Sequence, residues 1–161
     1  MRALPHPREA QQLARLRSLR VQRARDRCTQ AQAQVERAMG AVEARQQEIE
    51  RRRGEVGSLA HAMVHGLAPA MPRWAELVDA QREKLSEALE RAEYALIRDE
   101  RELEDAQERL QQARAELTRA LAREDAVRGL ADEVRRAHGL MREQRAELEL
   151  EDQGRGSPRS R

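Results

Sequence analysis

The chain has 161 residues and a formal net charge of +2; 37% of its side chains are charged and 1% are aromatic. A packed globular core of this length draws on aromatic anchors, so the composition is typical of long, exposed helices rather than of a packed domain. No apolar run approaches the roughly 20 residues that span a bilayer, and the first residues lack the apolar centre of a signal peptide. The only cysteine is Cys28, which excludes an intramolecular disulfide, and we expect a cytoplasmic protein.

Proline and glycine divide the chain into two long segments. They cluster in the first eight residues, in the stretch from His65 to Arg73 and in the tail from Gly154. The segments between these clusters are free of proline and predict an all-α fold with two helices. The predicted boundaries are a helix over 7–64, a loop over 65–72 and a helix over 73–150, which form one hairpin domain over 1–150, followed by a disordered tail over 151–161.

The first helix carries an apolar seam with a seven-residue period. Its members are Ala14, Val21, Cys28, Val35, Val42, Ile49, Val56 and Met63. The position three residues further along is small, charged or apolar: Arg17, Ala24, Ala31, Ala38, Arg45, Arg52 and Leu59. This 3.5-residue spacing is typical of a coiled coil.

The second helix repeats this seam. Its members are Leu89, Leu96, Leu103, Leu110 and Leu117 on one position, and Val78, Leu85, Ala92, Asp99, Ala106, Ala113, Ala120, Val127, Val134 and Met141 on the other. A loop centred near Pro69 pairs residues whose numbers sum to about 138, such as Val35 with Leu103 and Ala31 with Ala106. Alternating Val–Leu and Ala–Ala layers let two helices approach closely. The sequence therefore predicts a long antiparallel two-helix coiled-coil hairpin.

Two features of the second helix depart from a regular seam. Asp99 lies on the seam, opposite Ala38 in the predicted register, where a single polar residue fixes the register at a cost in stability. Because the second helix is the longer one, it overhangs from about Ala131, and Gly129 and Gly139 weaken the helix there. We expect this end to be the most mobile.

The residue patterns favour neither catalysis nor metal binding. His61 and His65 have the spacing of helical zinc ligands, but Ala62 stands where a zinc protease carries its general-base Glu, and the sequence nearby offers no third ligand. Cys28 fits the seam as a small buried residue, and the carboxylates from Asp99 to Glu108 spread around a helix as a solvated face. The sequence also lacks phosphate-loop, dinucleotide-binding and nucleophile-elbow motifs. We expect no enzymatic activity, no metal and no cofactor.

Arginine is concentrated at the open end of the predicted hairpin. The residues are Arg15, Arg17, Arg20, Arg23, Arg25 and Arg27, with Arg109, Arg114, Arg119 and Arg123 alongside in the predicted register. Like charges gathered in one place favour an acidic partner. A protein with an acidic cavity is favoured over nucleic acid, because no aromatic residues are interleaved for base stacking and the acidic middle of the second helix repels phosphates. A solvated surface without a partner is the remaining interpretation.

The only tryptophan, Trp74, lies just after the predicted loop. We expect it to cover the last seam layer against Leu59 and Met63. An exposed contact for a partner is the alternative.

Four segments resemble the type III secretion central stalk proteins of the YscO type. They are LRSLRVQRARDR (16–27), PRW (72–74), DAQREKLSEALERAEYAL (79–96) and LQQAR (110–114). The wider group includes the flagellar export protein FliJ, which shares the long hairpin and an Arg-Trp just past its loop. The resemblance covers roughly residues 10 to 145.

The resemblance implies a non-enzymatic stalk that couples a hexameric secretion ATPase to the export gate at the inner membrane and that binds export chaperones. The open end of such a stalk enters the ATPase pore, which on this chain implies contacts at Arg15, Arg17, Arg20, Arg23, Arg27, Arg114, Arg119 and Arg123. The tip side meets the gate or chaperones, which implies contacts at Trp74, Ala80, Lys84, Glu87 and Arg91. We expect a peripheral cytoplasmic protein that is monomeric when free, without membrane insertion. A basic coiled-coil scaffold and a nucleic-acid-associated protein are the alternatives.

Overall fold

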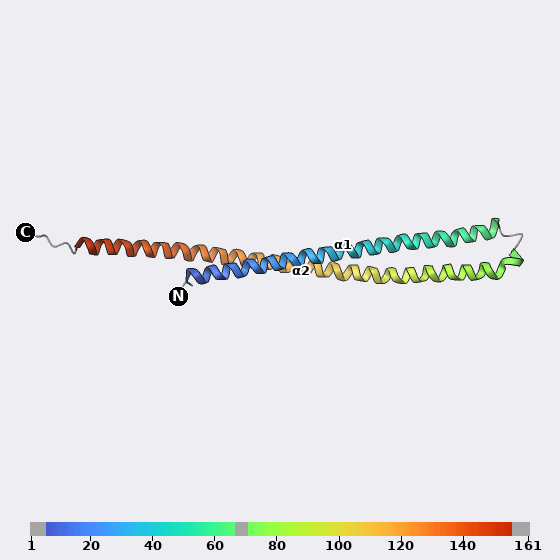
Figure 1. The fold of residues 1–161 in the computed structure, drawn as a ribbon, viewed down its shortest axis with the longest axis horizontal. Coiled ribbons are helices and arrows are strands. Elements are labelled where there is room, and N and C mark those ends of the chain that lie inside the picture. Colours follow the sequence, from blue (N-terminus) through green and yellow to red (C-terminus); the bar gives the residue numbers. More distant parts are fainter. Residues whose placement is uncertain (1–5, 67–70, 156–161) are drawn as a thin grey trace, which may run out of the picture. The chain divides into compact units, whose positions relative to one another are not determined.

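The computed structural model describes residues 6–66 and 71–155, and the side chains of residues 6–66 and 74–152. Two helices make up this part of the chain: α1 (Pro7–His65) and α2 (Met71–Arg155), shown in Figure 1. Helix α1 confirms the predicted helix over 7–64. Helix α2 begins two residues earlier than predicted and continues five residues past 150, so residues 151–155 of the predicted tail are helical. Residues 156–161 of that tail and 67–70 of the predicted loop lie outside the described residues.

Helix α1 begins with a capped first turn. The backbone N–H groups of Glu9 and Ala10 donate to the His6 carbonyl at 2.9 and 3.1 Å. The Glu9 carboxylate accepts a hydrogen bond of 3.2 Å from the His6 N–H, in the manner of a capping box. Pro7 is the first helical residue, where its missing N–H has no intrahelical partner to lose. These contacts fix where α1 starts.

The two helices form two compact units, and each helix runs through both. Unit 1 joins residues up to Cys28 with residues from Ala113 onward, and unit 2 spans Thr29–Gln112. Within each unit the α1 and α2 segments pack side by side in antiparallel directions. The predicted all-α, two-helix fold is confirmed. Within the described residues, neither helix is long and apolar enough to cross a membrane.

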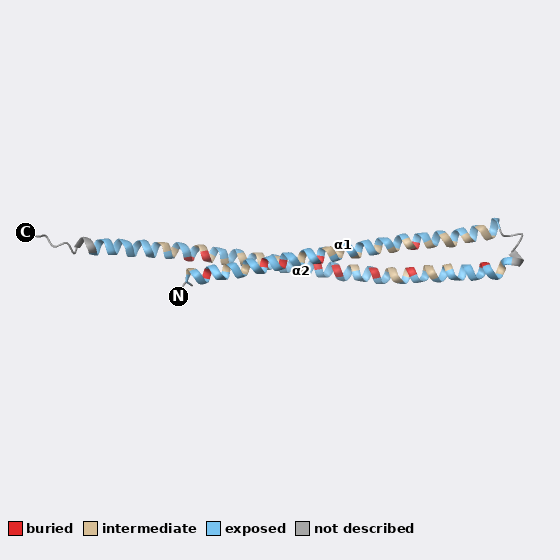
Figure 2. Ribbon diagram, viewed as in Figure 1, coloured by how far each residue is buried: buried red, intermediate tan, exposed pale blue. Residues whose placement is uncertain are grey.

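A narrow stripe of small and branched side chains holds each unit together (Figure 2). In unit 1 the most buried members are Ala10, Val21, Ala24, Ala131 and Val134; in unit 2 they are Ala31, Ile49, Val78, Ala92, Ala106 and Leu110. Every predicted seam position is buried or half-buried except Met141, which is 54% exposed. The seam prediction is therefore confirmed up to Val134.

The predicted register, with paired residue numbers summing to about 138, is wrong by almost one heptad. The interhelical ion pairs join Arg27 to Glu116, Arg45 to Asp99 and Arg53 to Glu93, whose numbers sum to 143, 144 and 146. Ala10 packs against Val134, with the same sum of 144. Asp99 therefore faces Arg45 rather than Ala38.

The error has a geometric cause. In the observed register His65 is level with about residue 79, so the first turns of α2 extend past the end of α1 instead of mirroring it about Pro69 (Figure 1). A shift of one heptad leaves the same side chains on the seam, because the seam repeats every seven residues. The pattern of apolar residues therefore identifies the packed faces without selecting the register.

Candidate functional site

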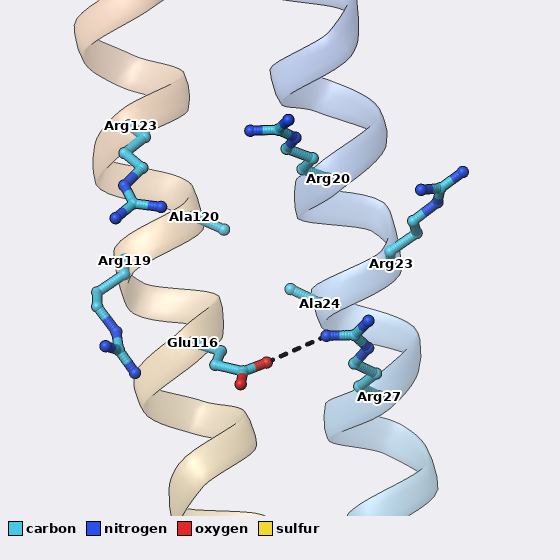
Figure 3. Close-up of a pocket in the computed structure, with 8 residues that line it drawn as sticks. All are labelled: Arg20, Arg23, Ala24, Arg27, Glu116, Arg119, Ala120 and Arg123. Atoms are coloured by element: carbon cyan, nitrogen blue, oxygen red, sulfur yellow. Dashed lines mark hydrogen bonds and ion pairs between the residues drawn. The ribbon is translucent and has the colours of Figure 1, made fainter.

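A groove of about 390 Å³ runs between the helices of unit 1 and is lined mainly by arginine (Figure 3). Its lining consists of Arg20, Arg23, Ala24 and Arg27 from α1 with Glu116, Arg119, Ala120 and Arg123 from α2. Five of the eight arginines predicted to bind a partner at the open end thus share one groove.

Helical spacing explains why these side chains line the same groove. Arg20, Arg23 and Arg27 are three and four residues apart, so they lie on one face of α1, and the same rule places Arg119 and Arg123 together on α2. Ala24, which is 7% exposed, and Ala120 lie between the two arginine rows. Their small side chains let the helices approach and leave the groove open above them.

The groove is strongly positive because its lining contains five arginines and a single carboxylate, Glu116. Arg27 Nη1 lies 3.3 Å from Glu116 Oε2, and both side chains are at least half exposed, so this ion pair contributes little to stability. Arg119 Nε donates to the Ala115 carbonyl of its own helix at 3.2 Å. Within the described part of the chain, no carboxylate forms an ion pair with Arg20, Arg23 or Arg123. The guanidinium donors of the groove are therefore available to an anionic partner.

The other three arginines of the predicted open-end set do not line the groove. Arg15 and Arg114 are exposed, and Arg17 is half-buried on the seam. They add positive charge around the groove without shaping it.

The residues predicted to contact an export gate lie on one exposed face of α2. Ala80, Lys84, Glu87 and Arg91 are spaced by four, three and four residues and all are exposed. Arg91 Nη2 lies 3.8 Å from Glu87 Oε2. Trp74 is 48% exposed, so it does not seal the last seam layer as predicted. The prediction that it is mainly a packing residue is wrong.

Sequence reasoning missed two apolar members of this face. Leu77 is 66% exposed and Tyr94 is 74% exposed, and they extend the spacing of Ala80 and Arg91 by three residues at either end. Leu77, Ala80, Lys84, Glu87, Arg91 and Tyr94, which we call the α2 tip face, are spaced alternately by three and four residues. This spacing was the available signal.

A charged cluster interrupts the seam of unit 2. Arg45 Nε donates to Asp99 Oδ2 at 3.0 Å, and Arg45 Nη1 donates to Glu48 Oε2 at 2.6 Å. Arg52 bridges Glu48 and Glu55 at 3.7 and 3.4 Å. The hydrogen bond that Arg45 donates to Asp99 is the main cause of a raised pKa at Arg45. The cluster joins both helices and is structural.

The candidate metal and nucleophile positions hold no assembled site within the described residues. The rings of His61 and His65 lie 4.4 Å apart and tilted by 46°, but no group of three or more His, Cys, Asp or Glu side chains is placed to hold a metal. Cys28 is half-buried on the seam. The arginine groove and the α2 tip face are two candidate surfaces for partners.

No protein-family model matches the chain, and neither the curated proteins nor the solved structures include a match.

Proposed function

We propose that the chain is a non-enzymatic central stalk of a bacterial type III secretion export apparatus of the injectisome class. In this proposal the arginine groove of unit 1 binds inside the pore of a hexameric secretion ATPase. The α2 tip face contacts the export gate at the inner membrane or an export chaperone. The protein is cytoplasmic and peripheral to that membrane.

The observation that carries the proposal is the convergence of five arginines from two helices on one groove that holds a single carboxylate. Such a concentration of charge is costly unless an acidic surface receives it. Guanidinium groups form paired hydrogen bonds with carboxylates, which suits loops rich in Asp and Glu. Two helices that pack on alanine also make a narrow support, which a central pore requires.

The α2 tip face supports the second contact. It combines two exposed apolar side chains, Leu77 and Tyr94, with Lys84, Glu87 and Arg91. Exposed apolar and aromatic side chains next to charged ones are common on protein-binding surfaces. Trp74 lies one turn before Leu77 and enlarges the apolar part of this end.

Binding to the purified cognate ATPase hexamer tests the proposal. We expect the chain to bind and the variant Arg20→Glu with Arg23→Glu to bind at least about tenfold more weakly, because two close charge pairs become repulsive. The matched control is Arg51→Glu with Arg101→Glu, which makes the same charge change on exposed residues of unit 2. Equal binding of all three proteins would reject the groove as the ATPase site.

A nucleic-acid binding assay distinguishes the proposed stalk from a nucleic-acid-associated protein. The chain is passed over immobilised single-stranded DNA and duplex RNA at moderate salt. The proposal predicts that it elutes, because arginine alone, without aromatic stacking, gives weak and salt-sensitive retention. Retention on nucleic acid combined with no binding to the ATPase would favour the nucleic-acid-associated protein.

A further inference from the structure

The exposed large apolar side chains in the described part of unit 1 lie in two segments. Leu13, Leu16 and Leu19 form a leucine flank on α1, with exposed fractions of 42 to 59%. The second segment is residues 140–152 of α2, the α2 extension, which exposes Leu140, Met141, Leu148 and Leu150. Both segments are helical and leave apolar surface in water.

The α2 extension continues the seam past the level at which α1 begins. Val134 is 2% exposed and packs on Ala10, whereas Met141 and Leu148, seven and fourteen residues later, are exposed. The His6 ring contacts the His138 ring with centroids 5.8 Å apart, so the start of α1 is level with His138. Every residue from 140 to 152 is exposed (Figure 2). The extension is therefore a seam without a partner helix.

The two segments carry opposite charge. Leu16 and Leu19 are four residues before Arg20 and Arg23, so the leucine flank shares a face with two arginines of the groove. The extension carries five carboxylates against Arg142 and Arg145. Of these carboxylates, Glu147 and Glu151 lie one residue before and three residues after Leu148, beside its apolar stripe. A basic apolar face and an acidic apolar face are complementary.

The segments also lie at similar distances from His138, which is level with the start of α1. The middle of the extension, Ala146, is eight residues beyond His138, or about 12 Å, and Leu16 is level with about Arg128, ten residues before His138, or about 15 Å. A two-fold axis near His138 would therefore lay the extension of each copy along the leucine flank of the other. Such a contact is made twice and closes on itself.

We propose that two copies of the chain associate through this reciprocal contact, with the α2 extension of each docked on the leucine flank and on Arg20 and Arg23 of the other. A second copy fits because it supplies the complementary charge, the apolar stripe and the matching spacing at once. The contact covers part of the arginine groove, so the dimer and an acidic partner compete for the same arginines. The proposal replaces the expectation of a free monomer and does not depend on the proposed function.

Sedimentation equilibrium of the full chain over a range of concentrations tests this contact. The weight-average mass is expected to rise from 18.5 kDa toward twice that value as the concentration increases, and to fall again at high salt. Two charge-reversed variants, Glu147→Arg with Glu151→Arg and Arg20→Glu with Arg23→Glu, should each weaken the dimer at least about tenfold. The chain with all four substitutions should recover most of that loss, because the charges are again opposite.

The control is Glu83→Arg with Glu90→Arg, exposed residues of unit 2, and this variant should associate as the unaltered chain does. A chain that stays at 18.5 kDa at every concentration overturns the proposal. The partner of the α2 extension would then be a basic helix of another protein. The proposal is also overturned if each charge-reversed variant dimerises as the unaltered chain does, or if the chain with all four substitutions does not dimerise.

Discussion

Asp99 of α2 accepts a hydrogen bond of 3.0 Å from Nε of Arg45 of α1, at a point of the seam where both neighbouring layers are apolar or small. Asp99 is 8% exposed, and Arg45 also binds Glu48. A buried carboxylate needs such a partner, since an unpaired one carries a large desolvation cost. In the register that the sequence predicts, Asp99 would face Ala38 without a charged partner. The ion pair therefore explains why the observed register is preferred.

Replacing Arg45 and Asp99 tests how much this ion pair contributes to stability. Asp99→Leu is expected to lower the melting temperature by a few degrees, because it removes the main partner of the half-buried Arg45 guanidinium. Arg45→Leu with Asp99→Leu should restore the melting temperature or exceed it, because well-packed apolar residues replace a desolvated ion pair. Thermal unfolding followed by circular dichroism measures both. If Asp99→Leu alone were as stable as Arg45→Leu with Asp99→Leu, the Arg45 guanidinium would not need Asp99 as a partner.

Engineered cysteines test the register itself, in a chain that carries Cys28→Ser. Ala38 and Ala106 line one groove of unit 2, so Ala38→Cys with Ala106→Cys should form an intrachain disulfide on mild oxidation. Ala31→Cys with Ala106→Cys, the pair of the sequence-predicted register, is separated along the helix by about 10 Å and should not. The mobility shift on a non-reducing gel distinguishes them. Efficient cross-linking of the second pair alone would contradict the register.

Two glycines of α2, Gly129 and Gly139, should be replaceable with a gain in stability. A Cβ at Gly129 or Gly139 meets no atom within 4 Å, so Gly→Ala is expected to add about 1 kcal/mol of helix stability at each position. Amide hydrogen exchange of residues 125–145 measures this gain as slower exchange. Gly66→Ala is the matched control, since its Cβ would lie 3.3 Å from the Ala62 carbonyl oxygen and little gain is expected. Faster exchange in the Gly139 variant would contradict the open surroundings.

The sole tryptophan reports its own exposure. At 48% exposed, Trp74 should emit near the wavelength of tryptophan in water and should be quenched readily by acrylamide. Trp74→Ala is expected to change the free energy of unfolding by no more than about 0.5 kcal/mol, as at other surface sites. Blue-shifted, poorly quenched emission would support the seam-covering role that the sequence suggested.

Periodicity predicted most of the fold. The seven-residue spacing identified the packed faces of both helices, and the proline and glycine clusters located their ends to within a few residues. It did not give the register, because a heptad shift preserves the seam and the deciding contact is between two charged residues, Arg45 and Asp99. Residues 151–155 were assigned to the tail because of Gly154, but the Glu- and Leu-rich segment before it carries α2 on to Arg155.

The candidate site was predicted in part. Helical spacing brought Arg20, Arg23 and Arg27 together on α1. The predicted register, although wrong by about six residues, still placed Arg119 and Arg123 alongside them, because the groove lining extends over about two turns of each helix. Trp74 was assigned to packing because the predicted hairpin places it at the closed tip beside the last seam layer, yet the first turns of α2 extend past α1 and leave it exposed. Leu77 and Tyr94 were missed because both lie off the apolar seam, and the heptad pattern identifies only the packed face.

Stimulation of ATP hydrolysis is the most direct test of the central claim, that the arginine groove acts inside a secretion ATPase. The rate of the purified cognate ATPase is measured with increasing amounts of the chain, of the Arg20→Glu with Arg23→Glu variant, and of the Glu147→Arg with Glu151→Arg variant. We expect the unaltered chain and the Glu147/Glu151 variant to raise the rate, whereas the groove variant should leave it unchanged. A rate that the unaltered chain leaves unchanged, or that the groove variant raises equally, would contradict it.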